Sequence, residues 1–218
     1  MLGVDTTTSL GSVAVADSEG LVAEVCLRAD QGHSRWLVPA IDFLLRSAGL
    51  ARSDIEGFGV AEGPGSFTGL RVGLATVQGL AEGSGRRCVG VPTLDALAAA
   101  SLETERFVAA MLDAYRGQVF GAVYEAPGRV LIPCRAEPPL RFVELIPEGA
   151  AVVGGGAERY ADLIQRERPD LRLVPGGRCI AWEVARLARL AILAEGGGDP
   201  ASLRPVYLRE AEIRKSQS

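Results

Sequence analysis

The residues best suited to chemistry form a glycine-rich segment, EGPGSFTGLRVG, which occupies positions 62–73 between an apolar run and a helical pattern. Such segments are typical of phosphate-binding turns, because free amides at a helix N-terminus attract anions. No Lys-Ser or Lys-Thr pair follows the glycines, so the segment is not a Walker motif. Its glycine spacing also departs from the dinucleotide fingerprint, and Pro64 has no amide to offer a phosphate. The sequence therefore favours Ser66 as a helix N-cap, with a direct phosphate role as the weaker alternative.

A second candidate phosphate site follows the first apolar run of the chain. Asp5 is succeeded by the hydroxyl residues Thr6, Thr7, Thr8 and Ser9. A carboxylate and neighbouring hydroxyls are suitable ligands for a phosphate or for a metal-bound phosphate. Asp5, Thr6, Thr7 and Ser66 are therefore predicted as weak phosphate-binding residues, and a polar β-turn is the simpler alternative.

Residues that could catalyse a reaction or bind a metal ion are scarce. His33 is the single histidine, which excludes a two-histidine metal centre within this chain. Its neighbour Ser34 does not complete a catalytic triad, since no third group is indicated. The cysteines form no CxxC pair and are expected to be buried free thiols: Cys26, Cys88, Cys134 and Cys179. The sequence thus predicts no catalytic residue, no metal site and no cofactor.

Hydrophobic runs and turn signals predict the elements that must position these residues. In the first half, strands are predicted at 1–4, 12–16, 21–28, 55–61 and 88–91, and helices at 34–48, 67–82 and 94–102. The second half repeats this order, with strands at 106–112, 118–124, 129–134, 150–153 and 171–174, and helices at 142–146, 157–165 and 180–194. The segments VDTTTSLGSVAV and LDAYRGQVFGAV agree in detail, which makes Asp113 the counterpart of Asp5. We infer an internal duplication. The alternative is that two α/β halves share the same order of strands and helices without having arisen by duplication.

This order predicts an α/β fold of two ribonuclease-H-like lobes, each β-β-β-α-β-α-β-α, as in the actin, sugar kinase and Hsp70 superfamily. The expected domains are an N-terminal lobe at 1–103 and a smaller C-terminal lobe at 104–218, with any ligand in the crevice between them. In that superfamily a glycine usually follows the phosphate-binding Asp, where Thr6 stands here. The segment VVGGGAERY, near Val153, resembles the turn that packs on adenine.

Two predicted helices carry more apolar and glycine-marked surface than a single sheet would cover. The helix at 67–82 has an apolar stripe and two glycine pairs, 69/73 and 79/83, although each mid-helix glycine costs about 1 kcal/mol relative to alanine. Packing of this helix on its own sheet is the alternative explanation for one glycine face. The helix at 34–48 is apolar around much of its circumference, and surplus apolar surface typically marks an interface. The predicted partner-binding residues are Leu37, Ile41, Leu44, Leu45, Gly69, Leu70, Gly73, Leu74 and Val77.

The segments GPGSFTGLRVG, HSRWLVPAIDFLL, DTTTSLGSVAV and PVYLR closely resemble the TsaB (YeaZ) family, and the resemblance covers almost the whole chain. It implies an actin-like fold and a non-catalytic role in adding threonylcarbamoyl to adenosine 37 of tRNAs that read codons beginning with A. It also implies dimerisation with the catalytic paralogue TsaD through the two helices of the N-terminal lobe, with the TsaE ATPase joining the pair. TsaD holds its metal through a histidine pair, so a chain with one histidine fits the scaffold member.

Other hypotheses remain open from the sequence. Asp5 and the GGG turn motivate a free-standing ATP-dependent small-molecule kinase, whereas the single histidine disfavours a metallopeptidase. The two helices could also join two copies of the chain when its partner is absent. The net charge of −4 limits any tRNA contact to an indirect or local one. No run reaches the roughly 18 apolar residues of a membrane span and no secretory signal is visible, so we expect a cytoplasmic protein.

Overall fold

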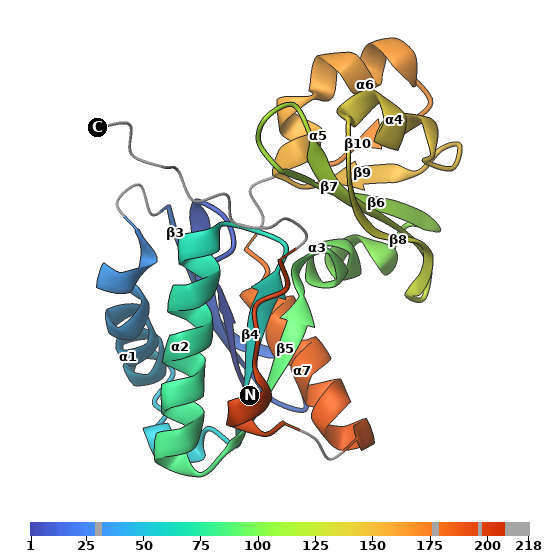
Figure 1. The fold of residues 1–218 in the computed structure, drawn as a ribbon. Coiled ribbons are helices and arrows are strands. Elements are labelled where there is room, and N and C mark those ends of the chain that lie inside the picture. Colours follow the sequence, from blue (N-terminus) through green and yellow to red (C-terminus); the bar gives the residue numbers. More distant parts are fainter. Residues whose placement is uncertain (29–31, 176–178, 196–197, 208–218) are drawn as a thin grey trace, which may run out of the picture.

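The structure, a computed structural model, describes residues 1–28, 32–175, 179–195 and 198–207. Its strands form two five-stranded mixed sheets with the same connectivity, and helices pack on both (Figure 1). In each sheet the first three strands form an antiparallel meander, and the other two run parallel to the first strand. The predicted pair of ribonuclease-H-like lobes is confirmed.

The strand bounds follow the predicted order closely. The first sheet, in the order β3-β2-β1-β4-β5, contains β1 (Leu2–Asp5), β2 (Leu10–Ala16), β3 (Leu21–Arg28), β4 (Gly57–Gly63) and β5 (Arg87–Pro92). The second sheet, in the order β10-β9-β6-β7-β8, contains β6 (Phe107–Asp113), β7 (Val119–Glu125), β8 (Arg129–Glu137), β9 (Ala151–Val153) and β10 (Arg172–Leu173).

The helices differ from the prediction mainly at their ends. The described helices are α1 (Leu37–Ser47), α2 (Phe67–Ser84), α3 (Thr93–Leu102), α4 (Pro139–Glu144), α5 (Gly155–Arg159), α6 (Ala161–Glu167) and α7 (Ala181–Glu195), with short 3-10 turns at His33–Arg35, Arg52–Asp54 and Pro200–Ser202. Ser66 caps α2 as predicted, because its side chain accepts a hydrogen bond from the Gly69 amide at 3.3 Å. The helix predicted at 157–165 is divided into α5 and α6 at Tyr160, whose backbone leaves the helical region.

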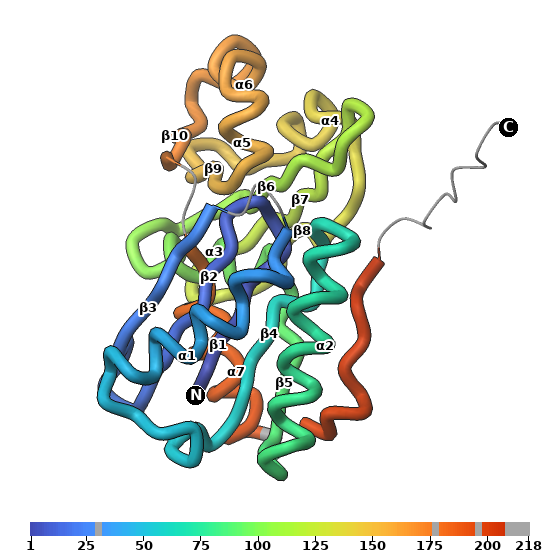
Figure 2. The backbone as a smooth tube through the Cα atoms, turned by 90° about the vertical axis from the view of Figure 1, so that its left-hand side faces the viewer, coloured from blue at the N-terminus to red at the C-terminus, as the bar shows by residue number. Residues whose placement is uncertain are grey.

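The helices α1 and α2 cover one face of the first sheet, and α7 covers the other (Figures 1 and 2). The backbone of α7 lies so close to the strands that a Cβ at Gly59 would be 2.6 Å from Ala188 Cβ. The amides that open α7 are capped from the first sheet, Ala181 by Ser12 Oγ and Trp182 by Glu24 Oε1, both at 3.1 Å.

The predicted boundary after residue 103 separates the strands of the two sheets. However, α7 lies on the first sheet, and residues 198–207 run alongside α2 (Figure 2). The division of the chain into domains stays a prediction, and any such division must count α7 with the N-terminal lobe. In the described part of the chain, every helix falls short of the length or the hydropathy that a membrane span needs.

One cysteine prediction is wrong. Cys26 in β3 and Cys179, just before α7, form a disulfide with their Cα atoms 6.0 Å apart. Their separation of 153 residues leaves no spacing motif in the sequence, because only the return of α7 to the first sheet brings them together. Cys88 is a buried free thiol as expected, and Cys134 is free and half-buried.

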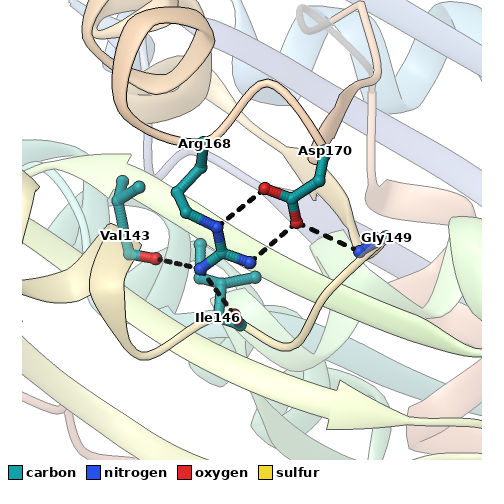
Figure 3. Close-up of polar contacts among 5 residues, drawn as sticks. All are labelled: Val143, Ile146, Gly149, Arg168 and Asp170. Atoms are coloured by element: carbon teal, nitrogen blue, oxygen red, sulfur yellow. Dashed lines mark hydrogen bonds and ion pairs between the residues drawn. The ribbon is translucent and has the colours of Figure 1, made fainter.

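An ion pair after α6 joins the end of that helix to α4 and to the loop that precedes β9 (Figure 3). Arg168 donates two hydrogen bonds to Asp170, each at 2.8 Å, and also donates to the carbonyls of Val143 and Ile146 at 3.3 and 3.0 Å. The Gly149 amide donates to Asp170 Oδ2 at 3.3 Å. The neighbouring Arg168 guanidinium therefore lowers the pKa of Asp170 to about 2.

Candidate functional site

The predicted phosphate-binding hairpin, between β1 and β2, turns its leading side chains inward. Asp5 is buried, and its Oδ1 accepts hydrogen bonds from the Thr7 amide at 2.8 Å and the Thr7 hydroxyl at 2.7 Å. Thr6 is fully buried and donates from Oγ1 to the Gly69 carbonyl at 2.7 Å. Burial raises the pKa of Asp5 to about 6, although the bonds from Thr7 oppose the shift. Thr6 thus ties the hairpin to α2, and the bonds from Thr7 hold the Asp5 carboxylate within the hairpin.

The glycine-rich loop is the surface against which this hairpin packs. Ser66 donates its amide to the Thr7 carbonyl at 2.7 Å, and a Cβ at Gly65 would lie 2.6 Å from the same oxygen. A Cβ at Gly69 would collide with the Thr6 carbonyl, and one at Gly73 with the Thr6 hydroxyl. Real Cβ atoms do not approach so closely, so these glycines are needed for contact within the chain.

A cavity of about 750 Å³ lies between the lobes, beside the hairpin and the start of α2. Thr7, Ser66 and Gly155 of the GGG turn all border this cavity. The structure thus brings together three segments that the sequence offered as candidates for binding the phosphate or adenine of a nucleotide. The opposite wall carries Asp113, which binds Arg159 Nη1 at 3.1 Å through Oδ2. Asp113 therefore lines the larger cavity, whereas its counterpart Asp5 borders a smaller neighbouring pocket of about 140 Å³, which Gly154 and Gly155 also line.

Two exposed aromatic residues on the cleft walls were not predicted from the sequence. Phe67 opens α2 and is 41% exposed, and Tyr115 in the β6–β7 turn is 69% exposed. Tyr115 and the next residue, Arg116, have φ values of 58° and 53°, which residues other than glycine rarely adopt. Backbone outliers of this kind gather at functional sites, but only the folded backbone shows them.

His33 supports the hairpin from outside. It is buried, its Nε2 donates to the Thr8 carbonyl at 2.8 Å, and its Nδ1 accepts from the Trp36 indole at 3.2 Å. Burial lowers its pKa, which favours the neutral ring. Both ring nitrogens thus take part in hydrogen bonds within the chain. Within the described ranges, no three His, Cys, Asp or Glu side chains are grouped closely enough to hold a metal ion.

The predicted partner-binding residues lie on the inner faces of α1 and α2. All are buried, and most belong to the core between these helices and the first sheet: Leu37, Ile41, Leu44, Leu45, Gly69, Leu70, Gly73, Leu74 and Val77. The apolar stripe of each helix is the one that covers its own sheet. Ile41 and Leu45 also line the groove between α1 and α2, and the role of the nine residues in binding a partner stays a prediction.

An open groove of about 340 Å³ lies between α1 and α2. Its floor is apolar, formed by Leu2, Ile55 and Phe58, and one wall carries Gly79 and Gly83. A Cβ at either glycine would meet no atom within 4 Å. The second glycine pair in α2 is therefore not explained by packing within the described chain. The other wall includes Val38, which is 52% exposed.

The C-terminal PVYLR segment also reaches the glycine loop. Val206 donates its amide to the Glu62 carbonyl at 2.8 Å. The Tyr207 ring packs 5.2 Å from Phe67, and its hydroxyl accepts from Arg71 Nε at 3.2 Å. These contacts hold Phe67, at the start of α2, in place beside the interlobe cavity. Residues 208 and 209 of the motif lie outside the described residues.

Comparison with known proteins agrees with this architecture. A family model described as TsaD, tRNA N6-adenosine threonylcarbamoyltransferase, matches residues 14–151, more than half of the chain. The chain belongs to this family. The matched residues run from β2 to β9 and include α1, α2 and the glycine-rich loop.

Individual relatives confirm the predicted resemblance to the TsaB (YeaZ) branch of this family. The tRNA threonylcarbamoyladenosine biosynthesis protein TsaB of Escherichia coli K12 is 34% identical over 57% of this chain and 54% of its own. The chain thus spans about half the length of the curated relatives it matches. The solved structure of YeaZ from Pseudomonas aeruginosa superposes with a TM-score of 0.81 and 27% identity, over 95% of this chain and 98% of that one.

A more distant structure supports the fold alone. Component A of (R)-2-hydroxyglutaryl-CoA dehydratase from Acidaminococcus fermentans has a TM-score of 0.59 at 12% identity, over 88% of this chain and 98% of that chain. The α/β architecture of paired lobes is thus shared well beyond the TsaB branch.

Proposed function

We propose that this protein is a TsaB-type subunit in the synthesis of N6-threonylcarbamoyladenosine at position 37 of tRNAs that read codons beginning with A. In this proposal it binds a TsaD-type catalytic paralogue and activates it, without catalysing the transfer itself. Family membership and the TsaB relatives support the pathway. The single observation that supports the mode of action is the open groove between α1 and α2.

The shape and composition of the groove favour a helical partner. The apolar floor of the groove lies between two neighbouring helices. Gly79 and Gly83 in one wall leave room for the backbone of another helix to come close. On α1 the side chain of Val38, which lines the groove, is 52% exposed. Helices of a related lobe would bury this surface in a symmetric four-helix contact.

The inward-facing hairpin supports the non-catalytic part of the proposal. For Asp5 to bind a metal-bound phosphate, its carboxylate would have to give up the bonds from Thr7 and become exposed from full burial. These costs also weigh against a free-standing kinase, which needs a ready nucleotide site in the isolated chain.

Further partners follow from the same proposal. The TsaE ATPase would join the pair, tRNA contacts would be indirect or local, and two copies of this chain would share the groove when the paralogue is absent. Such a protein would act in the cytoplasm. The acidic balance of the chain, −4, fits a subunit that does not itself attract tRNA.

Mixing the purified protein with the TsaD paralogue of the same organism tests the proposal. Val38→Glu places a charge on the groove wall without disturbing the core, and Leu193→Glu makes the same kind of change on α7, where Leu193 is 67% exposed. We expect the wild-type chain and Leu193→Glu to form a complex by sedimentation and to support modification of tRNA in the complete system. Val38→Glu should do neither. The proposal would be overturned if the wild-type chain formed no complex with the paralogue, whether or not nucleotides were present. Normal binding by Val38→Glu would overturn it as well.

A further inference from the structure

A second hollow between the lobes lies at the other end of β7 from the interlobe cavity. It encloses about 440 Å³ between β5, α3 and α7 on one side and the β7–β8 hairpin on the other. β7 reaches both sites from one face, because Tyr124 follows Phe120 by four positions and alternate residues of a strand share a face. The volume falls within the range of about 300–1,000 Å³ that is common for small-molecule pockets.

Most of the wall of this pocket is apolar. The apolar side chains come from β5, α3 and α7: Val89, Val91, Ala99, Leu102, Leu187, Leu190 and Ala191. Leu190 is 50% exposed at the edge of the pocket, so the apolar lining continues to the surface. Such a lining accommodates a hydrocarbon or aromatic body.

A polar pair stands at the inner end of the pocket. The Tyr124 hydroxyl donates to Asp95 Oδ1 at 2.6 Å, and Tyr124 is almost fully buried. Burial, together with the bond to Asp95, raises the pKa of Tyr124, so the phenol stays neutral and remains a donor. Asp95 is therefore held in one orientation on the pocket wall.

The charges around the pocket are predominantly negative. Asp95 and Glu103 both line it, and the Glu62 carboxylate lies against Gly90, where it would block a Cβ. Arg186 is the basic residue of the described lining, and it is paired with Glu183 at 2.8 Å. Burial raises the pKa of Glu62, and the charge of Asp95 adds to the shift. A positive group placed here would relieve repulsion between carboxylates.

We propose that this pocket binds a small organic cation, a protonated amine with an apolar body. Its ammonium group would lie beside Asp95, and its body would fill the space between α3 and α7. Charge complementarity selects this class over a carboxylate or phosphate, because a second anion would face Asp95 and Glu103. The site is on the α7 face of the first sheet, opposite the α1–α2 groove, and it does not depend on the proposed subunit function.

Binding of 2-phenylethylamine to the isolated, ¹⁵N-labelled protein tests this proposal by NMR titration at neutral pH. Two probes of similar shape, the neutral 2-phenylethanol and the anionic phenylacetate, serve as ligand controls. We expect the amine to shift the amide signals of Gly90, Ala99 and Ala191, and to bind about tenfold or more tightly than the alcohol. Phenylacetate should not shift these signals.

Three variants make the test specific. Asp95→Asn should weaken binding of the amine by about tenfold, the usual size of one charge-assisted hydrogen bond. Leu190→Lys puts a positive charge at the exposed edge of the pocket and should weaken the amine more than the alcohol, which keeps the test valid if Asp95→Asn does not fold. Asp162→Asn, exposed on α6 in the second lobe, should change neither. Equal binding of amine and alcohol, or an unchanged affinity in Leu190→Lys, would overturn the proposal.

Discussion

Replacing Gly79 and Gly83 by alanine separates the stability of α2 from its possible contact with another subunit. Both glycines are exposed, and a Cβ at either position meets no atom within 4 Å. The isolated protein should therefore gain helix stability without a clash, by about 0.5–1 kcal/mol for each replacement in an exposed helix. Gly83 lies in the last turn of α2, so its gain should be at the lower end. The double variant should melt about 2–8 °C above the wild type.

The same two methyl groups should weaken the complex with the TsaD paralogue. In a close helix contact, extra methyl groups on the groove wall overpack the interface, which typically costs about 1–3 kcal/mol. That cost corresponds to a dissociation constant raised by about 5- to 150-fold. Differential scanning calorimetry on the isolated chain and titration calorimetry with the paralogue measure the two effects separately.

The prediction requires both that the alanine variant is more stable than the wild type and that it binds the paralogue more weakly. An alanine variant that is more stable and binds the paralogue as well as the wild type would refute the groove as the contact surface. A less stable variant would refute the open outer face of α2. Gly69→Ala is the matched control on the inner face, where the new methyl collides with the Thr6 carbonyl and should destabilise the isolated chain by about 1–3 kcal/mol.

Two further predictions concern pH. The pKa of Asp5 is about 6 in the folded state against 3.8 unfolded, so its contribution to stability is fully present below pH 3.8, and about 3 kcal/mol is lost as the pH rises through 6. Asp5→Asn should therefore be more stable than the wild type in urea at pH 7.5 but not at pH 4, and an equal difference at both would contradict this reasoning. The pKa of Asp170 is about 2 against 3.8, so its contribution is present above pH 3.8 and lost as the pH falls toward 2. Melting temperatures should accordingly fall more steeply from pH 4 to pH 2 in the wild type than in Asp170→Asn, and parallel curves would contradict this.

The order of elements could be predicted because each strand and helix carries its own hydrophobic period. The recurrence of VDTTTSLGSVAV as LDAYRGQVFGAV was enough to predict the duplication, which the matching strand orders confirm. The path of α7 could not be predicted in this way. An amphipathic pattern requires an apolar surface to pack against, but it does not specify which of two sheets provides it.

The site was harder to predict because residue type does not show which way a side chain points. Gly69 and Gly79 look equivalent in the sequence, yet the first is pressed against Thr6 and the second faces open space. Asp5 has the residue type of a phosphate ligand, but the Thr7 side chain holds it inward. Tyr115 gave no signal at all, since its left-handed backbone depends on the β6–β7 turn that the folded sheet imposes.

The return of α7 to the first sheet has a consequence for synthesis on the ribosome. After residue 103 has emerged, α1 and α2 can cover one face of the first sheet, but the face around Gly3 and Gly59 stays bare until Ala181–Glu195 is made. The N-terminal lobe therefore completes its core only after the entire second lobe has been translated. During that interval an apolar sheet face is available to chaperones or to other nascent chains, and a fragment that ends near residue 103 should aggregate, whereas the second sheet has all its strands before α7 appears.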